Sequence, residues 1–441
     1  MSRILFAWEL GANYGHLTRM APIAEKLRGS GHQVFFAARD ARSAAEILGP
    51  KGFAFAQAPL PSGRPRPKSG PGNHAEMLAL EGYADRVTLW GMARGWISLA
   101  QLFRAELVVA DHAPGALLAA WILGLPRAQI GSGFEIPPSG LPLPAIRPWE
   151  NISAERLRRS EQGVTETVNA VIRSFRGKEL ARIAELFESE ERILATFAEL
   201  DPFGPRAGER YVGPIYDAKL GDPGVWPEDG RPRIFAYLRP GVPGAENILQ
   251  ALRAAEATTL CVMPEIRPET ISKLGSDRLR IAPRPLQLAS VLSQADLMLT
   301  YGGHGVVGAA LVAGVPLLIA PGKVEQYLHA KRVEALGAGA IVGNDRSVAS
   351  IASRIEQALA DGKLNAAAGA FAEAHKGFEP ARAVEEAAKV IGDLAQRRSP
   401  QQKETESRAS ASAPSREPPA KASRTTPRKP SKAAKVKTKK R

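Results

Sequence analysis

Cysteine is almost absent from this chain, and no apolar run in it is long. Cys261 is the single cysteine among 441 residues, so the chain cannot form a disulfide with itself and has no zinc site built from cysteines. The longest apolar stretch, residues 306–321, is interrupted by Gly308, Gly314 and Pro316 and is short for a membrane-spanning helix. These shortages predict a soluble cytoplasmic protein, with peripheral contact to the inner membrane face as an alternative.

Acidic residues are scarce in one segment only. The chain has 59 Lys and Arg against 45 Asp and Glu, whereas residues 397–441 alone hold 15 basic and 3 acidic residues. Most of the formal net charge of +14 therefore belongs to this tail. The tail has almost no large apolar side chain, which predicts disorder. It is either a polybasic arm that contacts nucleic acid or an anionic membrane, or a solvated tail without a specific partner.

Strand and helix signals alternate along the chain in two runs. The first run starts near the N-terminus, and the rhythm restarts with "IFAYLRP" after a connector rich in Gly, Pro and Asp. Such alternation is typical of parallel sheets covered by helices. It predicts an α/β protein with two Rossmann-like domains. We place these domains at 1–216 and 232–379, with a linker at 217–231, a C-terminal helix at 380–396 and the disordered basic tail at 397–441.

The later part of the first run departs from this rhythm. Residues 133–149 are rich in proline, and residues 151–200 are charged and helix-prone. These segments predict an irregular wall followed by helix, and no strand is assigned to them.

A strand-to-helix turn in the second run has the composition of an anion site. Tyr301 ends an apolar strand, a helix starts near Val306, and Gly302, Gly303 and Gly305 lie between them. Glycines let a ligand approach the backbone closely, and the free N–H groups at a helix start favour negative charge. Taken alone, glycines at a strand-to-helix turn more often serve only the turn than an anion site.

The spacing around this turn resembles the C-terminal signature of the family 1 UDP-glycosyltransferases, including the bacterial macrolide and flavonoid enzymes. "YGGHGV" at 301–306 is followed by "GVP" at 314–316 and by "EQYLHA" at 325–330. "GHLTRMAPIAEKLRGSGHQV", "AELVVADHAPGALLAAWILGLP" and "YVGP" are similar to the family's N-terminal and linker segments. The resemblance covers about residues 3–395 and implies the GT-B fold, with two Rossmann-like domains facing a cleft. It also implies inverting sugar transfer from a nucleotide diphosphate sugar, without metal or other cofactor.

The chain departs from the family pattern at several donor positions. Tyr301 replaces the phosphate-binding histidine, Val306 replaces a Ser or Thr, and Glu325 replaces an Asp. Arg239, at the end of the first strand of the second run, can compensate because a guanidinium pairs with phosphate oxygens. His329 in place of Asn is not explained by the resemblance. The resemblance implies this donor-binding set: Arg239, Tyr301, Gly302, Gly303, His304, Gly305, Val306, Glu325 and Gln326.

Two side chains of the first run are candidates for catalysis. His16 opens a helix after the first strand, and Asp111 ends the strand "ELVVAD". A carboxylate bonded to one ring nitrogen fixes the tautomer of a histidine and raises the basicity of the other nitrogen. The resemblance implies that these two residues form the base that acts on the acceptor hydroxyl. His112 is a second candidate for the partner of His16, and no metal site is expected.

The acceptor is expected to be a small apolar or lipid-like molecule. We expect it to lie against residues 60–74, the Trp90–Trp96 region and residues 131–144, because their proline and aromatic side chains suit a flat or apolar molecule. Two alternatives stay open. One is a GT-B relative with other chemistry, such as a nucleotide-sugar epimerase or a lipid-linked-sugar transferase. The other is a catalytically dead binding protein, which the side chains at 301 and 306 favour.

Overall fold

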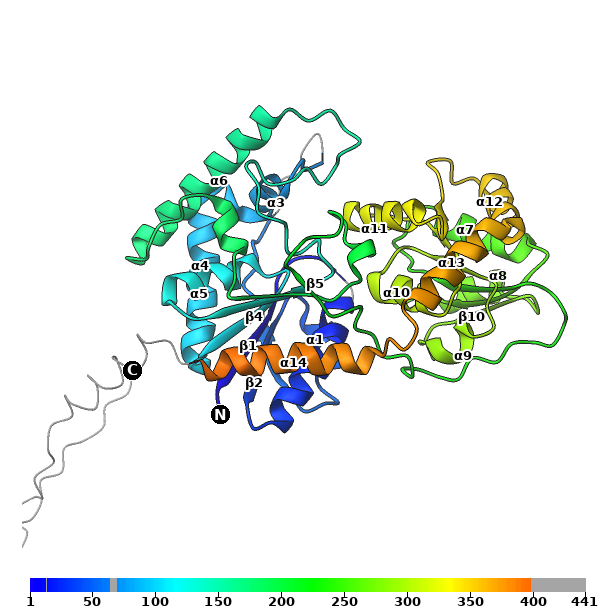
Figure 1. Cartoon of the computed structure of the whole chain (residues 1–441), viewed down its shortest axis with the longest axis horizontal. Helices are drawn as coiled ribbons and strands as arrows, with labels where there is room; N and C mark the ends of the chain where they lie inside the picture. The colour runs from blue at the N-terminus through cyan, green and yellow to red at the C-terminus, as the bar shows by residue number, and fades with distance from the viewer. Residues whose placement is uncertain (13, 64–69, 398–441) are drawn as a thin grey trace, which may run out of the picture. The chain divides into compact units, whose positions relative to one another are not determined.

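Two parallel β-sheets form the frame of the protein in the computed structural model, which describes residues 1–12, 14–63 and 70–397 (Figure 1). The first sheet has the strand order β3-β2-β1-β4-β5-β6-β7, and the second has the order β10-β9-β8-β11-β12-β13. The strands are β1 (Arg3–Trp8), β2 (Gln33–Ala38), β3 (Ala54–Gln57), β4 (Leu107–Asp111), β5 (Arg127–Gly131), β6 (Glu191–Leu194), β7 (Arg210–Tyr211), β8 (Arg233–Tyr237), β9 (Thr258–Val262), β10 (Leu279–Ala282), β11 (Leu297–Thr300), β12 (Leu317–Ile319) and β13 (Gly339–Ile341).

Helices connect the strands and cover the sheets. They are α1 (Gly15–Gly29), α2 (Ala41–Ile47), α3 (His74–Leu78), α4 (Arg86–Phe103), α5 (Pro114–Leu123), α6 (Ala154–Ser174), α7 (Ala245–Ala254), α8 (Pro268–Leu274), α9 (Leu288–Leu292), α10 (His304–Val312), α11 (Val324–Ala335), α12 (Val348–Ala360), α13 (Gly362–Ala374) and α14 (Pro380–Gln396), with the short turns η1 (Ala79–Tyr83), η2 (Ile183–Phe187) and η3 (Ala198–Leu200). Within the described ranges, no helix combines the length and apolar character needed to cross a membrane.

This architecture confirms the prediction of an α/β fold with two parallel sheets. Every strand pair in both sheets is parallel. In each sheet the strand order reverses beside the first strand, which creates a crevice at the carboxyl ends of the strands where ligands bind. The basic tail predicted to be disordered lies, from residue 398 on, outside the described residues.

The prediction for residues 151–200 is wrong at one point. Ala154–Ser174 form the expected helix, α6, but Glu191–Leu194 form the strand β6, which pairs in parallel with β5. Ile193 and Leu194 are fully buried in the first sheet. Burial between neighbouring strands decides their conformation, because a run of four residues carries too little periodicity to reveal a strand.

The last helix of the described chain belongs to the core of the first sheet. α14 packs along α1 (Figure 1), and its buried residues include Ala383, Ala387 and Ile391, whose spacing of four residues puts them on one face. The Oγ of Ser2 donates to the Ala395 carbonyl at 3.1 Å. The chain therefore returns to its own beginning after completing the second sheet.

A carboxyl group is buried directly after β1. The Oε2 atom of Glu9 accepts a hydrogen bond from the Gly115 N–H at 2.5 Å, at the start of α5. The indole of Trp96 lies so close that a Cβ on Gly115 would come within 2.6 Å of its Nε1 atom. Burial raises the pKa of Glu9 to about 8, and the charge of Glu81 adds to this effect. Glu9 is therefore protonated in the folded protein at neutral pH.

The Glu9→Gln variant is expected to become more stable than the wild type as the pH rises, because the wild type loses stability. The folded-state pKa lies above the unfolded value of 4.5, so the wild type loses stability as the pH rises from the unfolded pKa through the folded one. The slope is about 1.4 kcal/mol per pH unit in that window. Thermal unfolding at about pH 5 and about pH 8 should show a variant advantage at the higher pH only. Glu356→Gln, at an exposed carboxylate of α12, is the control, and an equal shift in both variants would contradict the prediction.

Candidate functional site

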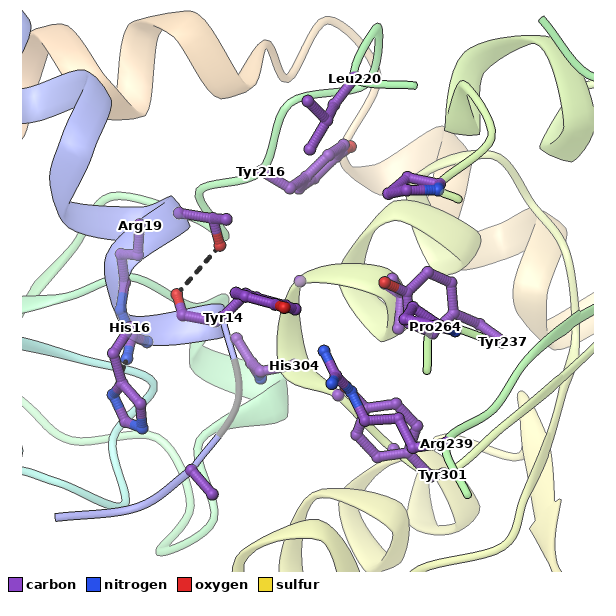
Figure 2. A pocket seen from close by; sticks show the side chains of 18 of the residues that line it. Tyr14, His16, Arg19, Tyr216, Leu220, Tyr237, Arg239, Pro264, Tyr301 and His304 are labelled. Carbon is purple, nitrogen blue, oxygen red and sulfur yellow. Dashed lines mark hydrogen bonds between the residues drawn. The ribbon is translucent and has the colours of Figure 1, made fainter. Parts of the chain in front are cut away.

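A cavity of about 450 Å³ lies where the carboxyl ends of the two sheets meet (Figure 2). The first half contributes the start of α1 and the loop after β5. The second half contributes the ends of β8 and β11 and the starts of α10 and α11. The chain between β7 and β8 supplies a further wall with Tyr216 and Leu220. Such a mixed apolar and polar cavity is typical of a small-molecule site.

The structure brings His16 and Asp111 together, although 95 positions separate them. β1 and β4 are neighbours with Trp8 opposite Asp111, which places the helix after β1 beside the end of β4. The Nδ1 atom of His16 lies 2.8 Å from the Oδ1 atom of Asp111, and Asp111 is fully buried. The Trp8 ring stacks on the imidazole with centroids 5.3 Å apart. The imidazole is thus fixed, with Nδ1 as the donor to the carboxylate.

The other ring nitrogen of His16 depends on a glycine for its space. Gly11 has a φ of +83°, and a Cβ at this position would lie 2.4 Å from the Nε2 atom. Only glycine adopts this conformation without strain and leaves the nitrogen uncovered. His16 lines the cavity, so Nε2 is the nitrogen available to a ligand.

Arg19, like Glu135, is a charged residue of this site that the sequence analysis missed. It lies one turn after His16 on α1, and its Nε and Nη2 atoms lie 2.8 and 2.9 Å from the two carboxylate oxygens of Asp111. Nη2 also lies 3.1 Å from the Oε1 atom of Glu135. The spacing of three residues, which puts two side chains on one helix face, was the signal in the sequence.

Glu135 closes this cluster from the loop after β5. Its Oε2 atom accepts hydrogen bonds from the N–H and the hydroxyl of Ser132, at 2.7 and 2.9 Å. Burial opposes ionisation of this carboxyl, but the charges of Arg19 and His16 hold the pKa of Glu135 well below its ordinary value. Two carboxylates and one guanidinium are therefore charged around the imidazole.

These same carboxylates suggest a metal site, but their surroundings do not fit one. Ligand atoms of His16, Asp111 and Glu135 lie within 4.8 Å of one another. The Arg19 guanidinium already bridges both carboxylates. A divalent cation would meet this fixed positive charge at short range, and carboxylate oxygens that it would need already accept hydrogen bonds from Arg19.

His112, the second candidate for the partner of His16, takes a different position. Its ring centroid lies 6.1 Å from that of His16, and neither of its ring nitrogens has a hydrogen-bond partner. Burial lowers the pKa of His112 to about 3, so the ring is neutral. The geometry favours Asp111 as the partner.

The glycine-rich turn of the second half faces the cavity as a helix start. α10 begins at His304, directly after Gly303, and Gly302 has a φ of +91°. A Cβ on Gly303 would lie 2.9 Å from the Tyr301 hydroxyl. No side chain caps this end of the helix, so its first N–H groups can receive an anion. Gly305 and Val306 line the same cavity.

Arg239 reaches from the end of β8 across the cavity. Figure 2 shows it beside Tyr301 and directed toward Tyr14, and its guanidinium lies 5.0 Å from the centroid of the Tyr14 ring. Its Nη1 atom lies 3.5 Å from the Glu265 carboxylate. Burial raises the pKa of Tyr301, while the nearby Arg239 opposes the rise. Tyr301 therefore offers a neutral hydroxyl next to a fixed cation.

The start of α11 supplies polar groups on the opposite wall. Glu325 and Gln326 line the cavity, and the Oε1 atom of Gln326 accepts from the Gly322 N–H at 2.9 Å, which leaves its NH₂ group for a ligand. Burial and the charge of Glu135 raise the pKa of Glu325. His329, one turn later, packs against His304 with the rings tilted by 41° and their centroids 4.6 Å apart. Packing against His304 explains why a ring at 329 is accommodated.

The expected acceptor surface is partly wrong. Trp96 is fully buried beneath Glu9, and Trp90 stacks on Phe175 at a centroid distance of 6.0 Å. Neither tryptophan is among the described residues that line the cavity, whereas Ser132 and Glu135 of the segment 131–144 are. Of the expected surface at residues 60–74, residues 64–69 lie outside the described residues. Trp96 is buried because its apolar position on α4 faces the core, whereas Trp90 is exposed but lies outside the cavity lining.

Comparison with known proteins connects this geometry to sugar transfer. Residues 246–390 match the family described as "Erythromycin biosynthesis protein CIII-like, C-terminal domain". The chain is 26% identical to a 4'-demethylrebeccamycin synthase from Lentzea aerocolonigenes, over 77% of this chain and 87% of the relative. It is 27% identical to a PGL/p-HBAD biosynthesis rhamnosyltransferase from Mycobacterium bovis (strain BCG / Pasteur 1173P2), over 84% of each protein.

A solved structure supports the same fold. The spinosyn rhamnosyltransferase SpnG, complexed with thymidine diphosphate, matches with a TM-score of 0.58 at 19% identity, over 88% of this chain and 100% of that one. The same fold and activity are indicated by the two parallel sheets, the family match and the two relatives. The chain is a glycosyltransferase with the GT-B fold, similar to the macrolide-type enzymes.

Proposed function

We propose that the protein transfers a sugar from a nucleotide diphosphate sugar to a hydroxyl of a small-molecule or lipid acceptor, with inversion and without a metal ion. One observation carries the proposal. His16, joined to the buried Asp111 at 2.8 Å, lines the same cavity as the uncapped start of α10. A base and an anion site therefore face one space from opposite halves of the protein.

In this reaction His16 is the general base. Its Nε2 atom takes the proton of the acceptor hydroxyl, while Asp111 holds Nδ1–H and stabilises the imidazolium that forms. The acceptor oxygen attacks the anomeric carbon as the bond to the diphosphate breaks on the opposite face. A single displacement of this kind inverts the configuration at that carbon.

The second half would bind the donor. The N–H groups at the start of α10, with Arg239 and the Tyr301 hydroxyl, would receive the diphosphate as its negative charge grows. Glu325 and the NH₂ group of Gln326 would bind sugar hydroxyls, next to His304. The thymidine diphosphate named in the SpnG structure supports a nucleotide diphosphate as the ligand of this region.

The metal-free part of the proposal rests on charge. Arg19 already pairs with both carboxylates that would otherwise attract a cation, and Arg239 supplies positive charge on the donor side. A helix start with a guanidinium can stabilise a leaving diphosphate in the role that a divalent cation has elsewhere. We expect activity to persist in the presence of EDTA.

The acceptor would enter from the first half, where apolar side chains border the cavity. Ile47, Ile215 and Leu220 lie on this border, which fits an apolar or lipid-like molecule. The alternative of a binding protein without catalysis is favoured by Val306, which has no hydroxyl for the diphosphate. An epimerase is a poorer fit, because Glu135 is bound to Arg19 and Ser132 and is not free to take a proton from a sugar carbon.

The decisive experiment combines binding with product detection. Thermal shifts with thymidine and uridine diphosphates would establish the donor, and mass spectrometry of an acceptor panel incubated with the matching sugar nucleotide would detect transfer. Stabilisation together with a glycosylated product supports the proposal. Stabilisation without any product from any acceptor supports the binding protein, and a changed sugar without acceptor supports the epimerase.

Replacing Arg239 with alanine is expected to weaken nucleotide diphosphate binding by roughly 10- to 100-fold, the effect of losing a charged hydrogen-bond donor. Because the leaving diphosphate carries more charge in the transition state, kcat should fall as well. Isothermal titration with the nucleoside diphosphate and steady-state kinetics measure both. Arg267→Ala, at an exposed arginine before α8, is the control, and equal affinity in both variants would remove Arg239 from the donor site.

A further inference from the structure

We infer that Arg19 and Glu135 are positioning residues that act on the reaction through the His16–Asp111 pair. This inference rests on the proposed function, because it assigns the role of the base to His16. Arg19 fixes the orientation of the Asp111 carboxylate, and Glu135 restores the negative charge that Arg19 removes from the pair. Neither residue needs to touch the substrate for this role.

The hydrogen bonds of Asp111 give the first argument. Its Oδ1 atom is shared by His16, at 2.8 Å, and by the Nη2 atom of Arg19, at 2.9 Å, while Oδ2 accepts from Nε at 2.8 Å. A two-point contact with a planar guanidinium fixes the plane of a carboxylate. Because α1 carries both His16 and Arg19, one helix sets the imidazole and the carboxylate relative to each other. Asp111 on its own would be free to rotate.

Charge gives the second argument. An arginine that pairs with Asp111 cancels the charge that would stabilise an imidazolium at His16. Glu135 contacts the same Nη2 atom that bonds Asp111, with its Oε1 atom 3.1 Å away, and brings the net charge of the group to −1 when His16 is neutral. With Glu135 present, the cluster still favours a proton on His16 during the reaction.

The carboxylate of Glu135 is held in position by its neighbours. Ser132 holds its Oε2 atom with two hydrogen bonds, and a Cβ on Gly131 would lie 2.7 Å from the same oxygen. Its side chain is almost completely buried. Burying a carboxylate here costs desolvation free energy, and an ion pair this deeply buried stabilises a fold little more than apolar packing would. Stability alone therefore does not account for Glu135.

The other titratable groups around His16 come from three elements. His112 follows β4 and is neutral through burial, and His304 at the start of α10 is held neutral in the same way. Glu325 on α11 interacts with His16 from the opposite side of the cavity. Removing the charge of Glu135 therefore leaves Asp111 and Glu325 as the acidic groups near His16, against the full charge of Arg19.

The test is the pH dependence of kcat/KM in Glu135→Gln, which keeps the size of the side chain and an oxygen for the Ser132 bonds. Loss of one negative charge disfavours the imidazolium, so the acid limb of the profile should move to lower pH by about one unit. A weaker base should also lower kcat by roughly 10-fold. The affinity for the nucleoside diphosphate, measured by calorimetry, should stay as in the wild type.

A second variant reverses the charge change. Arg19→Gln removes a positive charge, so its acid limb should move to higher pH, and the double variant with Glu135→Gln should return the limb toward the wild-type position. The double variant stays slow, because Asp111 has lost its two-point contact. If Arg19→Gln does not fold, Glu135→Gln decides the question alone.

Glu161→Gln is the matched control, because Glu161 is a buried carboxyl on α6 that bonds Asn73 and lies outside the cavity lining. It should leave the pH profile unchanged. An unchanged profile in Glu135→Gln, with any change of kcat, would show a purely structural role and overturn the inference. That outcome is distinct from failure of the proposed function, in which removal of His16 itself leaves catalysis intact.

Discussion

Replacing His16 with alanine should lower kcat by roughly 10²–10⁴-fold, the usual contribution of a positioned general base. The alanine has no group to take the acceptor proton, whereas Asp111 keeps its contacts with Arg19. The fold and donor binding should therefore be preserved. Single-turnover kinetics with saturating donor measure the chemical step, and calorimetry with the nucleoside diphosphate measures binding.

His32→Ala is the control for this prediction, because His32 is buried after α1 but does not line the cavity. It should keep the wild-type rate and pH profile. A His16→Ala enzyme that turns over normally, with an unchanged pH dependence, would remove the base from the proposed mechanism and leave only the fold.

Asp111→Asn should affect both the rate and the stability. The amide can present an N–H group toward His16, which favours the wrong tautomer, and kcat should fall by roughly 10²–10⁴-fold. The same change removes one of the two carboxylates that pair with Arg19, whose side chain is only 9% exposed, and leaves Glu135 as the other. Weakening a buried ion pair from one side should lower the free energy of unfolding by about 3 kcal/mol. Activity assays and urea unfolding measure the two effects.

Asp277→Asn, at an exposed aspartate before β10, controls for the chemical change itself. Rescue provides a further check on Asp111. Glutamate at position 111 keeps the charge and should recover stability more than rate, because the longer side chain misplaces the carboxylate. Full activity in Asp111→Asn would contradict the role assigned to the pair.

The sequence was sufficient for the architecture and for half of the charged cluster around His16. The α/β alternation predicted two parallel sheets, and strand ends located His16 and Asp111, because neighbouring parallel strands end at the same edge. Arg19 and Glu135 were missed for a physical reason. A charged residue on a helix or in a proline-rich loop is usually solvated, and its burial follows only from tertiary contacts.

The expected acceptor surface was partly wrong for a related reason, which concerns apolar rather than charged side chains. Trp96 has the composition of a ligand-binding residue, yet it fills the space between α4 and the first sheet. Large apolar side chains contribute most to a core when fully buried, so composition alone does not separate core aromatic residues from those of a site. Short strands such as β6 were missed because pairing with a neighbour, rather than local periodicity, stabilises them.

The return of α14 to α1 has a consequence for how the protein is made. The core beside Leu17 is completed by Ile391, so the N-terminal half cannot bury this apolar face until nearly the whole described chain has been synthesised. The second half, by contrast, has its own strands and helices in one continuous segment from β8 to α13. During translation the halves are therefore completed in the reverse of the usual N-to-C order. The nascent first half therefore exposes the apolar face of α1 until α14 has been synthesised.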